Sequence, residues 1–249
     1  MSGHSKWSSI KHRKAAVDAK RGQQFTKLAR AITVAAREGG GDPDANPALA
    51  TAVQKARDLS MPKDNIQRAI DRGTGAGAEA QAIKRVVFEG YGRGGVAIMV
   101  EALTDNHNRT SAEVRHAFSK HGGNLGEPGS VAWIFDKRGV ALVDAERYGE
   151  DDLIPAIDAG AEDVQQDGDL LKVISDPSDL AAVREALEGA GIEVQSSDLA
   201  MEPRNVVEVA ESDAPALLRL LDALEEHDDV SEVHANFDIP QEVLEKAAA

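Results

Sequence analysis

Residues 162–174 read EDVQQDGDLLKVI, and this stretch predicts a β-hairpin. The dipeptide Asp167-Gly168 is a turn signal that separates the run EDVQ from the apolar run LLKVI. On either side the chain continues with a helical pattern and then a strand-like run, so residues 139–201 read strand, helix, strand, strand, helix, strand. This is the order of a split β-α-β unit, and it predicts a ferredoxin-like α/β domain.

A weak internal repeat extends this prediction along the chain. AEVRHAFSKHGGNL at 112–125 resembles AAVREALEGAGIEV at 181–194, and looser copies run from 153 to 164 and from 215 to 233. Each copy has a helix, a polar or glycine break and a strand, so four copies predict two domains of two units each.

The pieces on either side of the central unit, residues 95–135 and 204–238, show the same order of elements. The second domain is therefore expected to be inserted in the first. Residues 136–202 would form the inserted ferredoxin-like α/β domain, and residues 79–135 and 203–249 would form the discontinuous one.

The runs KRVVFEGY at 84–91 and GVAIMVEA at 95–102 predict two strands around a glycine-rich turn. The turn, Gly90 to Gly95, formally fits the dinucleotide pattern G-x-G-x-x-G. That fingerprint requires a helix next, whereas Val96 to Val100 is a strand-like run, so we interpret the segment as a hairpin. The second run is apolar on both faces, which is typical of an interior strand.

The first 78 residues predict a helical domain, which makes the expected fold class α+β. Apolar residues recur at helical spacing from Phe25 to Ala36, and a loop rich in Gly, Asp and Pro follows at 39–50. Asn46 and Pro47 are typical of an N-cap and a first helical turn, and a further helix is expected after Pro62. Gly73 is the expected stop of that helix, and residues 73–80 read as a flexible linker.

Charge divides the chain into two parts of opposite sign. The first forty residues hold nine basic and two acidic side chains, net +7, whereas the whole chain carries −15. Residues 1–85 hold 16 basic and 8 acidic side chains, net +8, which leaves 12 basic and 35 acidic side chains, net −23, in residues 86–249. A basic segment on an acidic protein is not needed for solubility, so it indicates a partner that carries phosphate.

A cationic run by itself is more often a solvated helix face than a binding site. Here residues 8–21 have few apolar anchors but many cations, and this favours binding. Trp7 lies among the cations, where it either stacks on a base or sugar or anchors the helix. The candidate nucleic-acid-binding residues are Lys6, Trp7, Lys11, His12, Arg13, Lys14, Lys20, Arg21, Lys27, Arg30 and Arg37.

The segment Thr104 to Phe135 is a candidate secondary surface. It combines an Asn/Asp-rich helix entry with a glycine-rich loop from Gly122 to Gly129. Amides in such loops can bind anions, although glycine more often only makes turns. The residues of this surface are Arg109, Arg115, Lys120 and Asn124.

No pattern typical of catalysis or of a cofactor site is found. The chain has no cysteine, so thiol catalysis and thiolate metal sites are excluded. The seven histidines are scattered, and acidic pairs such as Asp228-Asp229 are expected to be solvated caps. The sequence has no apolar run near the length of a membrane span and no secretory signal, so we expect a cytoplasmic protein without cofactor, metal or membrane contact.

Six segments carry a resemblance that spans essentially the whole chain. They are GHSKWSSIKHRKAAVDAKRGQQFTKL from Gly3, GGGDPDANPALATAVQKA from Gly39, MPKDNIQRAI from Met61, FEGYG from Phe88, TDNHNRTSAEVRHAFSKHGGNLGEPGSVAWIF from Thr104, and DDVSEVHANFDI from Asp228. In these segments the chain resembles the YebC/PmpR family, which includes a mitochondrial translational activator of cytochrome oxidase. The resemblance implies three domains, no catalysis and a role in controlling gene expression. It also implies nucleic-acid contact at Lys6, Trp7, Lys11, His12, Arg13, Lys14, Lys20 and Arg21.

Four residues depart from the pattern of the family. Gln23 and Gln24 stand where relatives tend to carry a cation and an apolar residue, Arg93 where proline is common, and His107 where arginine is frequent. The departures change the local charge and leave the resemblance intact.

Two functions are open at this point. One is a DNA-binding transcriptional regulator, and the other is a ribosome-associated translation factor that binds ribosomal RNA. In the second case the acidic α/β domains would meet the ribosome or another basic protein.

We expect the triple substitution Lys11→Ala, Arg13→Ala and Lys14→Ala to weaken nucleic-acid binding equally for all sequences. The salt dependence of log K should flatten by at most about 0.9 for each phosphate of duplex DNA that the variant no longer neutralises. Filter-binding titrations over a range of salt concentrations measure this slope, and an unchanged slope would contradict the assignment.

Overall fold

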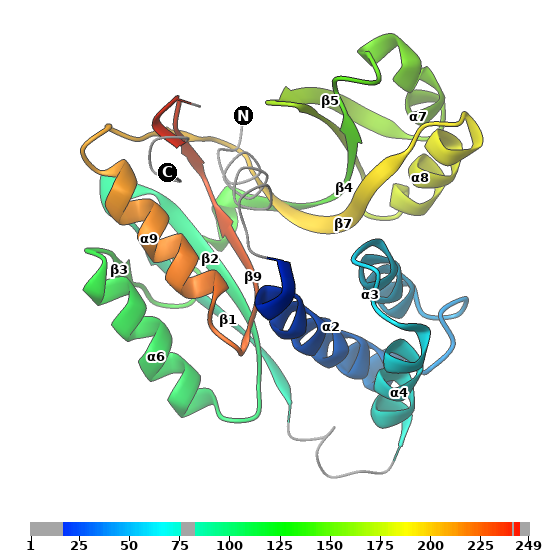
Figure 1. Ribbon diagram of the computed structural model, residues 1–249. Helices are drawn as coiled ribbons and strands as arrows, with labels where there is room; N and C mark the ends of the chain where they lie inside the picture. The colour runs from blue at the N-terminus through cyan, green and yellow to red at the C-terminus, as the bar shows by residue number, and fades with distance from the viewer. Residues whose placement is uncertain (1–16, 76–82, 241, 245–249) are drawn as a thin grey trace. The chain divides into compact units, whose positions relative to one another are not determined.

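The computed structural model describes residues 17–75, 83–240 and 242–244 (Figure 1). The described chain forms two compact units. The first unit is Phe135–Glu202, and the second comprises the described residues before and after it. No helix in the described ranges is long and apolar enough to cross a membrane.

The second unit begins with three helices, α2 (Val17–Gly39), α3 (Pro47–Asp58) and α4 (Lys63–Thr74). The side chain of Asn46 accepts a hydrogen bond from Leu49 N (3.2 Å), and Pro47 stands in the first turn, so the expected start of α3 is confirmed. Asn46 Nδ2 also donates to Ala35 O, which ties the end of α2 to the start of α3. The core of the three helices is formed by Leu28, Ile32, Ala35, Ala36, Leu49, Val53, Ala56, Met61, Ile66, Ala69 and Ile70.

A four-stranded antiparallel sheet follows, with strand order β3-β1-β2-β9. Its strands are β1 (Lys84–Tyr91), β2 (Ala97–Thr104), β3 (Asn124–Leu125) and β9 (Val230–Ala235). The turn between β1 and β2 is the 3₁₀ segment η1 (Arg93–Gly95), so the expected hairpin is confirmed and no helix follows the glycines. β2 lies between β1 and β9 and is almost entirely buried, as its apolar pattern predicts.

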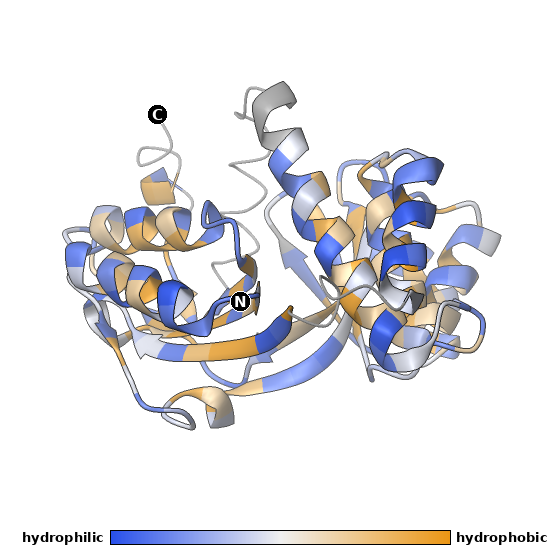
Figure 2. Ribbon diagram, turned by 90° about the horizontal axis from the view of Figure 1, so that it is seen from below, coloured by the Kyte–Doolittle hydropathy of each residue, from blue (hydrophilic) through white to orange (hydrophobic). Residues whose placement is uncertain are grey.

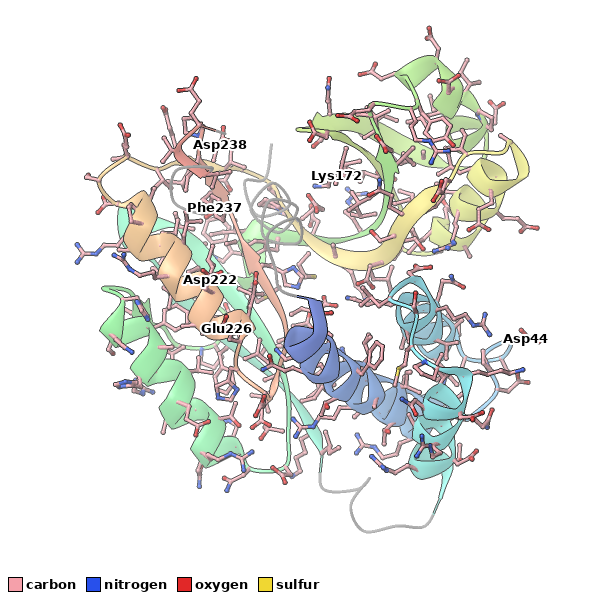
Figure 3. All side chains as sticks on the ribbon, viewed as in Figure 1. Asp44, Lys172, Asp222, Glu226, Phe237 and Asp238 are labelled. Atoms are coloured by element: carbon pink, nitrogen blue, oxygen red, sulfur yellow. The ribbon has the colours of Figure 1, made fainter. Side chains whose placement is uncertain are left out.

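Two helices, α6 (His107–Lys120) and α9 (Ala214–Glu225), pack on one face of this sheet (Figure 1). Their apolar sides meet inward-facing residues of the strands such as Val100 and Val233. Figure 2 shows the result as apolar colour in the strands and on one side of the helices, with hydrophilic residues on the other side. Phe237, labelled in Figure 3, is a fully buried member of this core.

The connection of this sheet differs from the expectation in one respect. A split β-α-β order would place a strand from the segment after residue 203 beside β2. Instead β1 occupies that position, and β8 (Val207–Glu208) pairs in parallel with β10 (Phe237–Asp238) outside the sheet. The segment at 131–135, expected as a strand, is largely the 3₁₀ turn η2 (Ala132–Ile134). The hairpin of β1 and β2 is local in sequence and supplies the pairing that the distant strand was expected to make.

The first unit has the order predicted from its sequence. Its elements are β4 (Phe135–Asp144), η3 (Glu150–Leu153), α7 (Ile154–Asp158), β5 (Ala161–Asp167), β6 (Leu170–Ser175), α8 (Leu180–Gly189) and β7 (Val194–Pro203). The strand order β5-β6-β4-β7 is that of a ferredoxin-like sheet, and Gly168 turns the central hairpin with φ +65°. Lys172, labelled in Figure 3, is 1% exposed and forms an ion pair with Glu202.

The fold class is therefore α+β, as predicted. The division into residues 1–78, the discontinuous pair 79–135 and 203–249, and the insert 136–202 stays a prediction.

Gly73 has a different role from the one expected. Helix α4 continues to Thr74, and a Cβ added at Gly73 would lie 2.3 Å from Thr33 O in α2. The absence of a side chain at Gly73 lets the backbones of α2 and α4 approach closely.

We expect Gly73→Ala to lower the free energy of unfolding by about 1–3 kcal/mol, because the added methyl group overpacks this contact. The matched control is Gly22→Ala, where a Cβ would meet nothing within 4 Å. The control should raise helix stability by about 0.5–1 kcal/mol, since alanine loses less backbone entropy than glycine. Urea denaturation followed by circular dichroism measures both, and equal effects would contradict this account.

Candidate nucleic-acid interface

The predicted binding residues fall into two groups. Lys6, Trp7, Lys11, His12, Arg13 and Lys14 lie outside the described residues. Lys20 and Arg21 lie in the first turns of α2. Lys27, Arg30 and Arg37 lie further along the same helix.

One side of α2 contacts the end of α9 and the turn that follows it. Lys27 Nζ donates to Glu225 O (2.5 Å), and Gln23 Nε2 donates to Glu226 O (2.6 Å). Glu226 is labelled at the end of α9 in Figure 3. The last carbonyl groups of a helix lack partners within the helix and carry partial negative charge, so an amine and an amide are favourable there.

Arg30 continues this contact one turn further along α2. Its Nη1 donates to Asp228 O (3.0 Å) and to Asp229 Oδ1 (2.8 Å). The guanidinium therefore binds inside the chain, although 32% of the side chain is still exposed. The prediction that Lys27 and Arg30 bind nucleic acid stays a prediction.

The Asp229 carboxylate is the centre of a network that joins distant segments. Its other oxygen, Oδ2, accepts from Arg109 Nη2 (2.7 Å), Thr110 Oγ1 (2.8 Å) and Thr104 Oγ1 (3.1 Å). Asp229 O accepts from Leu103 N (2.7 Å). Asp228 and Asp229 were both expected to be solvated caps, and this is wrong for Asp229, which is only 4% exposed. The physical reason is that tertiary contacts bring five hydrogen-bond donors to this residue.

Two opposing effects act on the pKa of Asp229. Burial raises it, because a charged carboxylate loses hydration. Hydrogen bonds from Arg109, Thr110, Arg30 and Thr104 outweigh the burial and lower the pKa from 3.8 to about 2. Asp229 is therefore an anion at neutral pH.

An open groove lies beside Arg30. It has a volume of about 470 Å³ and is lined by Phe25, Thr26, Ala29, Arg30, Met61, Asn65, Arg68, Ala69, Arg72 and Ile83. Arg68 and Arg72 are exposed and stand one turn apart on α4. Arg37, at the end of α2, donates from Nη1 to Ile83 O (2.7 Å). The lining combines the cationic side chains of Arg30, Arg68 and Arg72 with apolar residues such as Phe25 and Ala29, and this combination suits a phosphate backbone together with a sugar or base.

Arg68 and Arg72 were not among the predicted binding residues. Their spacing of four places them on one side of a helix, and this was a usable signal. Their meeting with Arg30 is decided by the packing of α4 on α2.

The predicted secondary surface is only partly available. Arg109 is paired with Asp229 and with Asp105 (3.1 Å), whereas Arg115, Lys120 and Asn124 are exposed on α6 and β3. The loop after β3 binds an anion that belongs to the chain itself. The Glu89 carboxylate accepts from Gly129 N (2.7 Å), Val131 N (2.7 Å) and Ala132 N (2.8 Å).

The same opposing effects set the pKa of Glu89. Burial raises the pKa, while the three amides lower it, and the net shift is downward. These three amides are therefore occupied by Glu89, and the part of the glycine-rich loop around Gly129 holds a structural carboxylate.

Comparisons with known proteins agree with this architecture. Residues 5–76 match the TACO1/YebC protein N-terminal domain, and residues 83–237 match the TACO1/YebC second and third domain. The chain belongs to the TACO1/YebC family. Its membership of this family confirms the resemblance seen in the sequence.

Relatives match the TACO1/YebC chain over its whole length. A protein of Rubrobacter xylanophilus is 61% identical over 249 residues, covering 100% of both chains. A protein of Halothermothrix orenii is 55% identical over 250 residues, covering 99% of this chain and 98% of the relative. Both are named "Probable transcriptional regulatory protein". The crystal structure of a conserved hypothetical protein from Aquifex aeolicus has a TM-score of 0.84 and 46% identity, covering 93% of this chain and 96% of that one.

We expect Asp229→Asn to lower the free energy of unfolding at neutral pH by about 2 kcal/mol. This is the free energy that corresponds to the difference between the pKa of Asp229 in the unfolded and the folded state. Because the pKa is lower in the folded state, this stabilisation is present above pH 3.8 and is lost as the pH falls toward about 2. Chemical denaturation at a series of pH values should show the difference between wild type and variant shrinking over that range.

Asp228→Asn is the matched control, since Asp228 is an exposed neighbour. It should change the free energy of unfolding by less than about 0.5 kcal/mol. A wild-type advantage over Asp229→Asn that persists at the lowest pH would contradict an electrostatic origin.

Proposed function

We propose that this protein is a non-enzymatic, nucleic-acid-binding regulator of gene expression that acts in the cytoplasm on DNA. The observation that carries the proposal is the charge division, net +8 in residues 1–85 against net −23 in the remainder. Cations gathered on one part of an acidic protein favour a polyanionic partner, because releasing counterions from phosphates drives such binding. The names of the relatives support a role in transcription.

The binding surface that we propose has two parts. The basic stretch from Lys6 to Arg21 would contact the phosphate backbone. The groove lined by Arg30, Arg68 and Arg72, whose lining also includes Phe25, would hold an adjoining stretch of the same strand. Contacts of this kind position a backbone without reading base sequence, so weak sequence preference is expected.

A ribosome-associated translation factor that binds ribosomal RNA is the second candidate. The net charge of −23 in residues 86–249 favours this candidate. An acidic surface attracts basic ribosomal proteins, whereas it repels nucleic acid. Nucleic acid that copurifies with the protein distinguishes the two candidates. DNase-sensitive material supports the first, and RNase-sensitive material of ribosomal size supports the second.

The groove is tested by Arg68→Ala combined with Arg72→Ala in the full-length protein. We expect weaker binding to DNA or RNA. With duplex DNA the salt slope should be flatter by up to about 0.9 for each phosphate that the double variant no longer neutralises. Fluorescence anisotropy at several salt concentrations measures both quantities.

The matched control is Arg219→Ala, which removes a cation from an exposed position on α9 outside the groove. It should leave the slope unchanged. Equal slopes for the wild type and the double variant would exclude the groove from the binding surface. If only the Lys11, Arg13 and Lys14 variant binds more weakly, the surface is confined to the basic stretch.

A further inference from the structure

Three side chains that the nucleic-acid surface does not use meet on the face of the sheet opposite α6 and α9. They are Glu101 in β2 and Glu232 and His234 in β9. The register pairs Glu101 with Glu232 and Met99 with His234, so all three side chains project from the same face. Their neighbours Val100 and Val233 point the other way, into the core.

The two distances from His234 suit ligands of one small metal ion. His234 Nε2 lies 3.5 Å from Glu232 Oε2 and 3.7 Å from Glu101 Oε1, and one ligand atom from each residue falls within 4.8 Å of the others. A tetrahedral Zn²⁺ ion with ligands at about 2.0–2.2 Å separates those ligands by about 3.3–3.6 Å. The two distances from His234 Nε2 are close to that separation.

The ring nitrogen of His234 provides an independent indication. His234 is only 8% exposed, and its Nε2 is buried without a hydrogen-bond partner in the described part of the chain. Leaving a buried polar nitrogen unpaired costs about 1–3 kcal/mol, and such atoms are rare in folded proteins. A metal ion bound to Nε2 would remove this cost.

Two carboxylates of like charge face each other across the two strands, and each has a cationic partner in the chain. Glu101 and Glu232 stand directly opposite each other, and like charges in that position destabilise a sheet. Lys55 Nζ lies 2.6 Å from Glu232 Oε1, and Arg85 Nη1 lies 3.4 Å from Glu101 Oε2. These cations hold one oxygen of each carboxylate, so the other oxygens, Glu232 Oε2 and Glu101 Oε1, are the ones near His234.

We propose that Glu101, Glu232 and His234 bind one Zn²⁺ ion that links β2 to β9. One imidazole and two carboxylates form a ligand set that zinc accepts, with the fourth position left to water. The three ligands lie in β2 and β9, and none of them belongs to the proposed nucleic-acid surface.

The test is titration of the full-length, EDTA-stripped protein with Zn²⁺ by isothermal calorimetry. We expect His234→Gln to bind one equivalent less than the wild type. Counting equivalents by difference removes the contribution of histidines elsewhere in the chain. His116→Gln is the matched control, because His116 is exposed on α6, and it should bind the same number of equivalents as the wild type.

Two further measurements test the site in case His234→Gln folds poorly. Glu232→Gln keeps the imidazole, and it should bind Zn²⁺ at least tenfold more weakly at this site. In the wild type, Co²⁺ should give the intense visible absorption of a tetrahedral site, and Zn²⁺ should shift the NMR signals of the His234 ring. No Zn²⁺ binding by the wild type, an equal number of equivalents in His234→Gln, or a His234 ring that responds only to pH would overturn the proposal.

Discussion

The buried carboxylate of Asp229 is the interaction on which the second unit depends most. It lies in the turn between α9 and β9 and accepts from residues of α2, of the end of β2, and of α6. Its chain neighbours add to this role, since Leu103 N donates to Asp229 O and Arg30 also binds Asp228 O. A buried anion of this kind is stable only when all of these donors are in place, so it couples helices and strands that are far apart in the sequence.

This network changes how the cations of α2 should be understood. From the sequence they form one basic surface, but the structure divides them by what they contact. Lys27 and Arg30 hold the end of α9 and the Asp229 turn, and Arg37 binds the carbonyl of Ile83. Arg30 also borders the groove that contains Arg68 and Arg72. A nucleic-acid strand in that groove would therefore lie next to the contact between the helices and the α/β part, where binding and folding stability can influence each other.

The carboxylates of this protein also fall into two groups, exposed ones that contribute charge and buried ones that accept hydrogen bonds. Much of the negative charge lies on exposed helix ends and loops, yet Glu89 and Asp229 are buried and fully engaged as acceptors. Glu89 shapes the loop from Gly129 to Ala132 by binding its amides, which is why an anion-binding pattern in that loop does not by itself indicate a ligand site. The remaining acidic residues give residues 86–249 a negative electrostatic potential, opposite in sign to that of residues 1–85.

The sequence by itself determined the features that depend on neighbouring residues. The turn at Gly168, the cap at Asn46, the hairpin around Arg93 and the interior position of β2 all follow from local propensity and apolar pattern. The α+β class follows from the order of these elements. The charge division is a property of composition and needs no coordinates.

Only the tertiary structure decided which side chains meet across the chain. The sequence around Asp229 does not predict its contacts with Arg30 and Arg109, which are 199 and 120 residues away. The placement of β1 beside β2, the groove with its three arginines, and the cluster around His234 have the same origin. Their partners are chosen by packing and register, and these depend on many weak contacts that a short stretch of sequence does not encode.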